Sequence, residues 1–229
     1  MEEERIVISL GGSLIVPENI DSDFVKKFKE TILSHVKEGK KFVIITGGGR
    51  TSRKYTDALS VIMQDVTTKQ LDWLGIYATR LNAHMLQMAI GEDFAKREII
   101  ENLDEDIDFS TPIRIGGGTK PGHSSDGAAV EIAKKIGAKK IINLSNIDHV
   151  YDSDPRKNSN AKKFEKISWS QYLDLIPKEW TPGLSTPFDP IASKEAQESG
   201  IQVIIMNGKP TSNLDTYLSG GELDGTLIG

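Results

Sequence analysis

Three glycine-rich turns are the features of this sequence that could bind an anion. Each follows a short apolar segment, and they read Leu10-Gly11-Gly12-Ser13-Leu14, Thr46-Gly47-Gly48-Gly49-Arg50 and Gly116-Gly117-Gly118-Thr119-Lys120. A strand that ends in glycines lets a ligand reach bare backbone, and the next helix points free N–H groups and its positive dipole end at negative charge. Phosphate best suits such turns. Because the turns would share one edge of a sheet, we expect a site for two phosphorylated ligands.

Charged side chains near these turns fit phosphoryl transfer, which needs cations, backbone donors around the phosphates and usually magnesium. Arg50 and Arg53 lie in the first turn of the helix expected after the second glycine turn, where they would grip a phosphate or remain solvated. Asp126 opens the helix after the third turn and would either cap that helix or orient a lysine or a magnesium-bound phosphate. The common P-loop and dinucleotide-binding fingerprints are absent from the sequence.

Five segments rich in β-branched residues are predicted to be the buried strands that carry the turns. They are residues 5–10, 42–46, 112–115, 141–144 and 201–206. Helical patterns alternate with them, at residues 23–37, at residues 125–136 closed by Gly137, and at residues 190–199 between an Asp189 N-cap and Gly200. This alternation predicts an α/β fold with a parallel sheet covered by helices on both faces.

Composition limits the class of protein. The chain has 229 residues, enough for one large α/β domain or two closely packed lobes. It has no cysteine, which excludes disulfides and thiolate chemistry, and its four histidines show no zinc-ligand spacing. A net charge of −5 argues against a broad nucleic-acid surface. Since neither a signal peptide nor an apolar run of about 20 residues is evident, we expect a cytoplasmic protein without membrane or nucleic-acid partners.

The segment 70–88 predicts a helix with more apolar surface than one face can bury. The apolar positions that step by three and four residues are Leu71, Leu74, Ala78, Leu81, Met85 and Met88, and Trp73, Ile76 and Tyr77 lie beside them. The helix is either buried in its own core or pairs in part with a second subunit, and both can hold at once.

The order of these motifs resembles the amino acid kinase superfamily and, within it, the archaeal type of uridylate kinases. The matching stretches cover nearly the whole chain and lie at residues 8–13, 46–53, 72–82, 117–126, 145–155 and 188–194. Residues 72–82 and the Gly-Gly-Thr-x-Pro-Gly-His segment at 117–123 separate uridylate kinases from acetylglutamate, aspartate and carbamate kinases. Thr46 disfavours isopentenyl phosphate kinases, which resemble this chain but carry histidine there.

The resemblance implies a three-layer αβα sandwich with a central, mostly parallel sheet, the amino acid kinase fold. It implies one domain over residues 1–229, with a UMP-binding lobe at about 1–138 and an ATP-binding lobe at about 139–229. The implied reaction is phosphorylation of UMP to UDP by ATP with Mg²⁺ in pyrimidine nucleotide biosynthesis. The implied assembly is a homohexamer, a trimer of dimers with the helix at 70–88 in the dimer contact.

The resemblance also assigns roles, position by position. The catalytic residues would be Asp126 as organiser of the centre, Lys194 as the cation that neutralises the transition state, and Arg53. The UMP-binding residues would be Gly48, Asp72, Gly118, Thr119, Lys120, Pro121, Gly122, His123, Ser124 and Ser125. The ATP-binding residues would be Gly11, Gly12, Ser13, Gly49, Arg53, Ser145, Asn146, Tyr151 and Asp154. Asp72 would accept hydrogen bonds from the ribose, residues 119–125 would enclose the uracil, and no side chain is assigned as a metal ligand.

Two positions depart from the family pattern. Ser9 stands where most relatives carry lysine, so Lys194, Arg53 and magnesium are expected to share the missing charge. His149 stands where glycine is usual, which predicts an altered turn. Segments 152–163 and 181–187 are expected to be mobile covers over ATP.

Two alternatives stay open. One is a kinase of the same fold for another small phosphate or carboxylate. The other is a nucleotide-binding regulatory or storage protein without turnover, which Ser9 favours and which the retained Asp72, Asp126 and Lys194 oppose.

Overall fold

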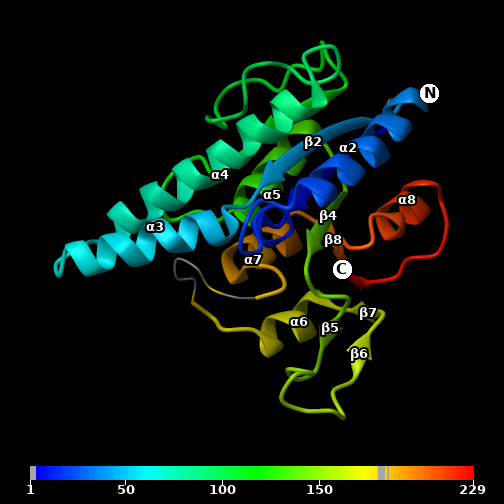
Figure 1. Ribbon diagram of the computed structural model, residues 1–229. Coiled ribbons are helices and arrows are strands. Elements are labelled where there is room, and N and C mark those ends of the chain that lie inside the picture. The colour runs from blue at the N-terminus through cyan, green and yellow to red at the C-terminus, as the bar shows by residue number, and fades with distance from the viewer. Residues whose placement is uncertain (1–3, 180–183, 185) are drawn as a thin grey trace.

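A seven-stranded sheet forms the centre of the computed structural model, which describes residues 4–179, 184 and 186–229 (Figure 1). Its strand order is β3-β2-β1-β4-β8-β9-β7. The strands are β1 (Arg5–Leu10), β2 (Lys41–Thr46), β3 (Ile113–Gly116), β4 (Lys140–Ser145), β7 (Lys166–Ile167), β8 (Gln202–Asn207) and β9 (Thr226–Ile228). The first five in spatial order are mutually parallel and are the five predicted from the sequence, whereas β9 runs antiparallel to β8.

Alternate strand residues bury two cores, one on each face of the sheet. Ile6, Ile8 and Leu10 face the layer of α2 (Ser22–Lys37), α4 (Thr68–Ile90) and α8 (Ser212–Leu218). Val7 and its neighbours Val43 and Ile141 face the layer of α5 (Ser125–Ile136), α6 (Trp169–Leu175) and α7 (Pro190–Glu198). The expected three-layer αβα sandwich with a mostly parallel sheet is therefore confirmed.

Two helices and a hairpin extend beyond the three layers. The single turn α1 (Gly12–Ile15) follows β1, and α3 (Gly49–Ile62) follows β2. Helix α3 packs against α4, and the two project together from the body of the molecule (Figure 1). The short strands β5 (Val150–Tyr151) and β6 (Lys163–Phe164) pair antiparallel and enclose the segment 152–162 as a hairpin loop.

Local capping chemistry fixes the helices that matter for the site. Helix α5 starts after Ser124, whose hydroxyl accepts from Gly127 N, and ends at Gly137 in the left-handed conformation. The Asp189 carboxylate caps α7 as predicted, accepting from Ile191 N and Ala192 N. Helix α4 begins two residues before the predicted segment, with a capping box between Thr67 and Gln70.

Helix α4 is buried on one side and exposed on another. Ile76, Ala78 and Leu86 are buried, whereas Tyr77 and Leu81 are 58% and 61% exposed. The prediction that this helix is at least partly buried in its own core is thus confirmed.

Two expectations concern the segment 181–187 and the absence of a membrane-spanning helix. Residues 181–183 and 185, within the expected cover at 181–187, lie outside the described residues. In the part of the chain that is described, no helix combines the length and the apolar character needed to cross a membrane.

Candidate active site

The first two glycine turns touch each other at the carboxyl-terminal edge of the sheet. Gly47 N donates to Leu10 O at 2.8 Å, which joins the end of β2 to the end of β1. A Cβ atom added to Gly12 would lie 2.1 Å from Gly49 N and 2.5 Å from the Gly47 carbonyl carbon. Gly49 itself has a φ of +60°. Only glycine allows this backbone contact, and it leaves the first turns of α1 and α3 side by side at the edge.

The predicted ATP segment after β4 adjoins the same turns. Gly11 N donates to Leu144 O at 2.8 Å, and Gly208 N donates to Ser145 O at 3.0 Å. Ser145 Oγ accepts from Ile147 N at 3.3 Å, and Asn146 is exposed. The structure therefore brings Gly11, Ser145 and Asn146 together along one edge of the sheet.

The third glycine turn leads into a loop that leans on helix α4. Gly122 N donates to Asp72 Oδ2 at 2.9 Å, which brings together two predicted UMP-binding residues. Thr119 Oγ1 is buried and has no hydrogen-bond partner among the described residues. A buried hydroxyl without a partner is costly unless a ligand or water satisfies it, so this atom marks a polar contact point in the loop.

The second half of this loop is held by helix α5. His123 Nδ1 lies 3.3 Å from Glu131 Oε1, and Lys120 Nζ lies 3.7 Å from the same oxygen. Ser124 caps the helix, followed directly by Ser125 as its first residue. The loop from Gly118 through Pro121 to Ser125 is thus anchored to α4 on one side and to α5 on the other.

Asp126 lies at the meeting point of β1, α5 and α7. Its Oδ1 accepts from Ser9 Oγ at 2.8 Å, and its Oδ2 accepts from Asp189 N at 3.2 Å. Burial, and then repulsion from the Asp189 carboxylate, raise the pKa of Asp126 to about 7, although its two hydrogen bonds oppose that shift. A carboxylate with such a pKa beside an anion-binding edge is a candidate functional group.

A buried tyrosine fixes the start of α7 beside Asp126. Tyr172 Oη donates to Phe188 O at 2.8 Å and accepts from Phe188 N at 2.7 Å. Because Phe188 directly precedes Asp189, this pair of bonds sets where the second carboxylate stands. The sequence identified Asp189 only as a helix cap, and nothing in it indicated that Asp189 would contact Asp126.

The predicted cations lie on the helices that start at this edge. Arg53 on α3 and Lys194 on α7 are exposed, and neither forms an ion pair with any residue that the structure describes. Arg50 Nε lies 3.4 Å from Glu18 Oε2. The structure shows no contact that brings Arg53 or Lys194 to Asp126.

Tyr151 and Asp154 belong to the β5–β6 hairpin. The Asp154 carboxylate accepts from Arg156 N and Nε, both at 3.0 Å, and the hydrogen bond from the Arg156 side chain lowers its pKa. The Tyr151 ring meets His149 edge to face at 6.4 Å. Neither Tyr151 nor Asp154 is hydrogen-bonded to a glycine turn within the described residues.

His149 does not need the backbone freedom of glycine. No non-glycine residue in the described part of the chain has a positive φ, so His149 adopts an ordinary backbone conformation. The expectation of a turn altered relative to the family stays a prediction. The side chain is buried, its Nε2 lies 3.8 Å from Asp224 Oδ1, and burial lowers its pKa.

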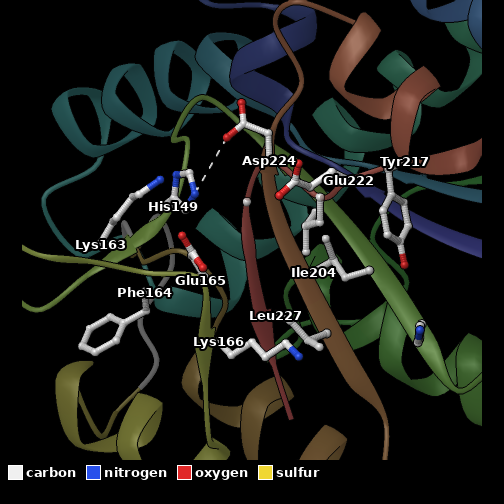
Figure 2. A pocket seen from close by; sticks show the side chains of 13 residues that line it. His149, Lys163, Phe164, Glu165, Lys166, Ile204, Tyr217, Glu222, Asp224 and Leu227 are labelled. Carbon is white, nitrogen blue, oxygen red and sulfur yellow. Dashed lines mark ion pairs between the residues drawn. The ribbon is translucent and has the colours of Figure 1, made fainter. Parts of the chain in front are cut away.

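A cavity of about 1130 Å³ lies apart from the glycine turns. His149 and Asp224 face each other at one end, and Tyr217 of α8 lies on the opposite side (Figure 2). Three lysines and three acidic residues line its walls, namely Lys140, Lys163, Lys166, Glu165, Glu222 and Asp224. Because the two kinds of charge balance, the cavity has no preference for an anion. None of the predicted site residues lines this cavity.

The Asp126 carboxylate at the carboxyl-terminal edge of the sheet suits a metal ion that binds together with a nucleotide. Among the described residues, no group of three or more His, Cys, Asp or Glu side chains could hold a metal ion. Magnesium is commonly held by phosphate oxygens, water and one or two carboxylates, and Asp126 is the carboxylate that fits this role.

Comparison with known proteins agrees with this geometry. The model of the amino acid kinase family matches residues 4–207. The uridylate kinase of Thermococcus onnurineus is 36% identical over 98% of this chain and 99% of its own length, and that of Methanocaldococcus jannaschii is 34% identical with the same coverage.

Solved structures extend the likeness to the whole fold. The crystal structure of uridylate kinase from Archaeoglobus fulgidus matches with a TM-score of 0.83, 30% identity, and coverage of 98% of this chain and 99% of that one. UMP kinase from Bacillus anthracis, at 19% identity and a TM-score of 0.76, shares the fold over 99% of this chain and 96% of its own. The chain belongs to the amino acid kinase family and, within it, to the uridylate kinases.

Proposed function

We propose that this chain transfers the γ-phosphoryl group of ATP to UMP and so forms UDP and ADP for pyrimidine nucleotide synthesis. The observation that carries the proposal is the convergence of the Gly11, Gly47 and Gly117 turns with Asp126 at one edge of the sheet. Full-length similarity to uridylate kinases from several organisms supports the choice of UMP.

The edge is divided between two ligands. The turn of Gly11, Gly12 and Ser13 would hold the phosphates of ATP, through the backbone N–H groups of Gly12 and Ser13, together with Gly49 and the start of α3. The nucleoside of ATP would lie toward Ser145, Asn146, Tyr151 and Asp154. The lobe at about 139–229 would bind the nucleoside of ATP, and the lobe at about 1–138 would bind UMP and contact the phosphates of ATP.

The acceptor would rest on the loop between α4 and α5. Asp72 would accept hydrogen bonds from the ribose hydroxyls while it keeps the bond from Gly122 N. Thr119 Oγ1, buried without a partner, supports this assignment because a uracil carbonyl or N–H would satisfy it. Gly48 and Arg53 would contact the UMP phosphate.

Phosphoryl transfer at this site would be driven by positioning and charge. Lys194 and Arg53 would place positive charge beside the transferred phosphoryl group. Asp126 would position these two cations relative to the phosphates. Magnesium bound with ATP would neutralise phosphate charge there, with Asp126 as its protein ligand.

We also propose that a second copy of the chain covers the exposed apolar side of α4 and α3. Tyr77, Leu81 and Met88 on α4 are 58%, 61% and 73% exposed, and Val61 and Ile62 on α3 are 84% and 77% exposed. Single exposed apolar residues are common, but this set lies on two adjacent helices and supports a dimer contact. Three such dimers would make the expected homohexamer, in the cytoplasm.

The test is a coupled assay of ADP release with magnesium, ATP and a panel of UMP, CMP, AMP, GMP and dUMP. The proposal expects kcat/KM for UMP to exceed that for every other monophosphate. Equal or higher activity with another acceptor would overturn the choice of UMP. Binding of ATP or UMP without any turnover would favour the regulatory or storage alternative instead.

A further inference from the structure

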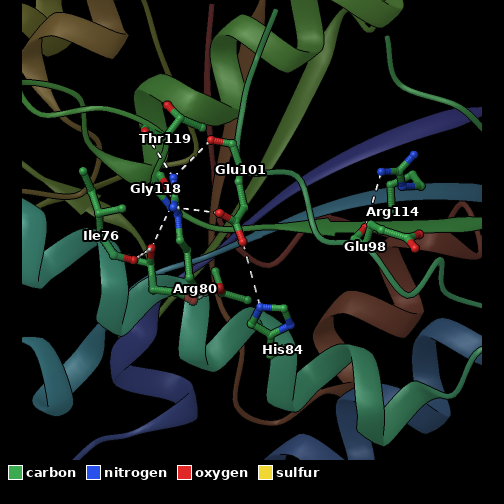
Figure 3. Close-up of polar contacts among 10 residues, drawn as sticks. Ile76, Arg80, His84, Glu98, Glu101, Arg114, Gly118 and Thr119 are labelled. Atoms are coloured by element: carbon green, nitrogen blue, oxygen red, sulfur yellow. Dashed lines mark hydrogen bonds and ion pairs between the residues drawn. The ribbon is translucent and has the colours of Figure 1, made fainter. Parts of the chain in front are cut away.

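Arg80 on helix α4 is hydrogen-bonded to the third glycine turn. Its Nε donates to Gly118 O at 3.0 Å, and one terminal nitrogen donates to Thr119 O at 3.2 Å (Figure 3). The side chain is 16% exposed. A planar guanidinium with two bonds to consecutive carbonyls fixes the plane of the backbone as well as its distance.

Glu101 completes the arrangement. Arg80 donates to Glu101 Oε2 at 2.8 Å and to Glu101 O at 3.1 Å, so both terminal nitrogens are engaged. The segment that carries Glu101 is itself paired with β3, because Ile100 N donates to Ile115 O at 2.8 Å. The guanidinium therefore joins three parts of the chain: helix α4, the strand-like segment before β3 and the loop after β3.

The neighbouring residue Thr79 supports the same turn. Its Oγ1 accepts from Gly118 N at 2.6 Å and donates to Ile76 O at 2.7 Å. A Cβ atom added to Gly117 would lie 2.7 Å from Thr79 Oγ1 and 2.9 Å from Arg80 N. The turn thus lies directly on α4, and Gly118 is held through both its N–H and its carbonyl.

The bonds of Arg80 act on the first part of the loop, where Thr79 holds only the Gly118 N–H and Arg80 holds the carbonyls of Gly118 and Thr119. Beyond Thr119, Gly122 is bonded to Asp72, and His123 and Lys120 face Glu131. The Thr119 hydroxyl has no partner among the described residues, so no hydrogen bond within them fixes it, and the backbone position sets what it can reach. The Arg80 guanidinium holds that backbone.

We propose that Arg80 is a positioning residue for the acceptor nucleotide: its guanidinium holds the Gly118 and Thr119 carbonyls so that the Thr119 hydroxyl and nearby backbone groups can read the base. This inference rests on the proposed function, in which the loop at 118–125 binds UMP. Arg80 touches no reacting atom in this role. Its loss would act on acceptor affinity and base discrimination and would leave the ATP half of the site intact.

The test compares steady-state kinetics of Arg80→Met, Arg80→Lys and the wild type in the full chain. We expect Arg80→Met to raise KM for UMP about tenfold, the range expected for losing hydrogen bonds from a charged group. The ratio of kcat/KM for UMP to that for CMP should fall, and KM for ATP should stay within about twofold. Arg80→Lys keeps the charge and one donor nitrogen but not the planar fork, so it should recover part of the UMP affinity and still fold if Arg80→Met does not.

Arg114 offers a matched control. It is a buried arginine that donates to the backbone carbonyls of Asp108 at 2.9 Å and Glu98 at 3.5 Å, apart from the acceptor loop (Figure 3). Arg114→Met and Arg80→Met should each lower the melting temperature, because each removes hydrogen bonds from a largely buried arginine. Arg114→Met should leave KM for UMP and the UMP-to-CMP ratio of kcat/KM unchanged. An equal rise of KM for UMP in both variants would overturn the positioning role, because a general loss of fold stability would then explain the rise.

Asp72→Asn separates failure of this inference from failure of the proposed function. If Asp72→Asn raises KM for UMP and Arg80→Met does not, the acceptor site stands and the role of Arg80 is wrong. If neither variant changes KM for UMP, the proposed acceptor site itself is wrong. A rise in both, with the base ratio changed in Arg80→Met, supports the inference.

Discussion

Ser9 donates a hydrogen bond of 2.8 Å to Asp126, across 117 positions of sequence. The bond joins the end of β1 to the first turn of α5, and Asp126 uses its other oxygen for Asp189 N. The family resemblance led us to expect lysine at the position of Ser9. A neutral donor there leaves Asp126 without a cation beside it, whereas the Asp189 carboxylate lies close by and helps to raise its pKa to about 7.

The first prediction follows from the influence of Asp189 on Asp126. If turnover needs ionised Asp126, kcat/KM should rise with pH through an apparent pKa near 7. Asp189→Asn removes a like charge and keeps an N-cap oxygen for Ile191 N and Ala192 N, so the acid limb should move to lower pH. The measurement is the pH profile of kcat/KM.

A control for this shift is Asp108→Asn, since Asp108 pairs with Lys96 at 2.9 Å on the surface. Its profile should match that of the wild type. An acid limb that stays in place in Asp189→Asn would show that repulsion between the two carboxylates does not control the titration.

The same carboxyl group should cost stability at high pH. The pKa of Asp126 is higher in the folded chain than its ordinary 3.8, so the folded state binds more protons and stability falls as pH rises from about 4 to about 7. Asp126→Asn should therefore raise the free energy of unfolding relative to wild type by at least about 1 kcal/mol at pH 8, and by less at pH 5. Urea unfolding at both pH values measures the difference. A stability gain that is equal at the two pH values would contradict the prediction.

Lys194 is the cation whose removal should affect chemistry more than binding. It lies on α7, the helix capped by Asp189, and is exposed. Lys194→Ala should lower kcat by about a hundredfold or more, because loss of one charged contact to a transition state costs several kcal/mol. The dissociation constant for UMP, measured by titration calorimetry, should stay near that of wild type.

Lys134→Ala serves as the comparison for that variant. Lys134 on α5 forms an ion pair of 2.7 Å with Glu195 on α7, the helix that also carries Lys194. Its removal therefore perturbs α7 without removing the proposed catalytic charge. Turnover in Lys134→Ala should match wild type. Wild-type turnover in Lys194→Ala would show that another group neutralises the transition state.

The central strands and the glycine turns could be predicted from sequence because each depends on local chemistry. A parallel strand buried on both faces is a short apolar run, and a helix such as α5 is delimited by its own Ser124 cap and Gly137. The strands β5, β6, β7 and β9 escaped prediction because they are two or three residues long and exist through pairing with distant partners.

The candidate site was predictable only as a set of residue types. Asp126 and Asp72 could be assigned through their motifs, yet the contact of Asp126 with Ser9 and Asp189 depends on how α5 and α7 pack on the sheet. Arg80 lies within the matching stretch 72–82, but nothing in the sequence indicated its contact with the third glycine turn. Its role arises because α4 passes beside Gly118, a relation between segments 38 positions apart.

Gly12 should be among the positions least tolerant of a side chain. An alanine Cβ there would meet Gly49 N at 2.1 Å and the Gly47 carbonyl carbon at 2.5 Å, and both are backbone atoms that cannot move aside cheaply. Gly12→Ala should destabilise the fold by several kcal/mol, as measured by urea unfolding, and abolish ATP binding. In contrast, Gly75→Ala in helix α4 meets only Ser52 Oγ at 3.4 Å and should stabilise the chain by about 0.5–1 kcal/mol. Similar effects of the two substitutions would refute the backbone contact between the first two glycine turns.

The exposed side of α4 yields the last prediction, which concerns assembly. Leu81 is 61% exposed, one turn after Tyr77 and two turns before Met88 on the same helix, so a partner's apolar surface would bury it. Leu81→Glu should introduce a charge that cannot be desolvated there and dissociate the assembly, as measured by analytical ultracentrifugation. Leu175→Glu is the control, because Leu175 is 43% exposed at the end of α6, away from α3 and α4, and should leave the mass unchanged. A wild-type chain that sediments as a monomer, or a Leu81→Glu variant of unchanged mass, would each exclude α4 as the contact.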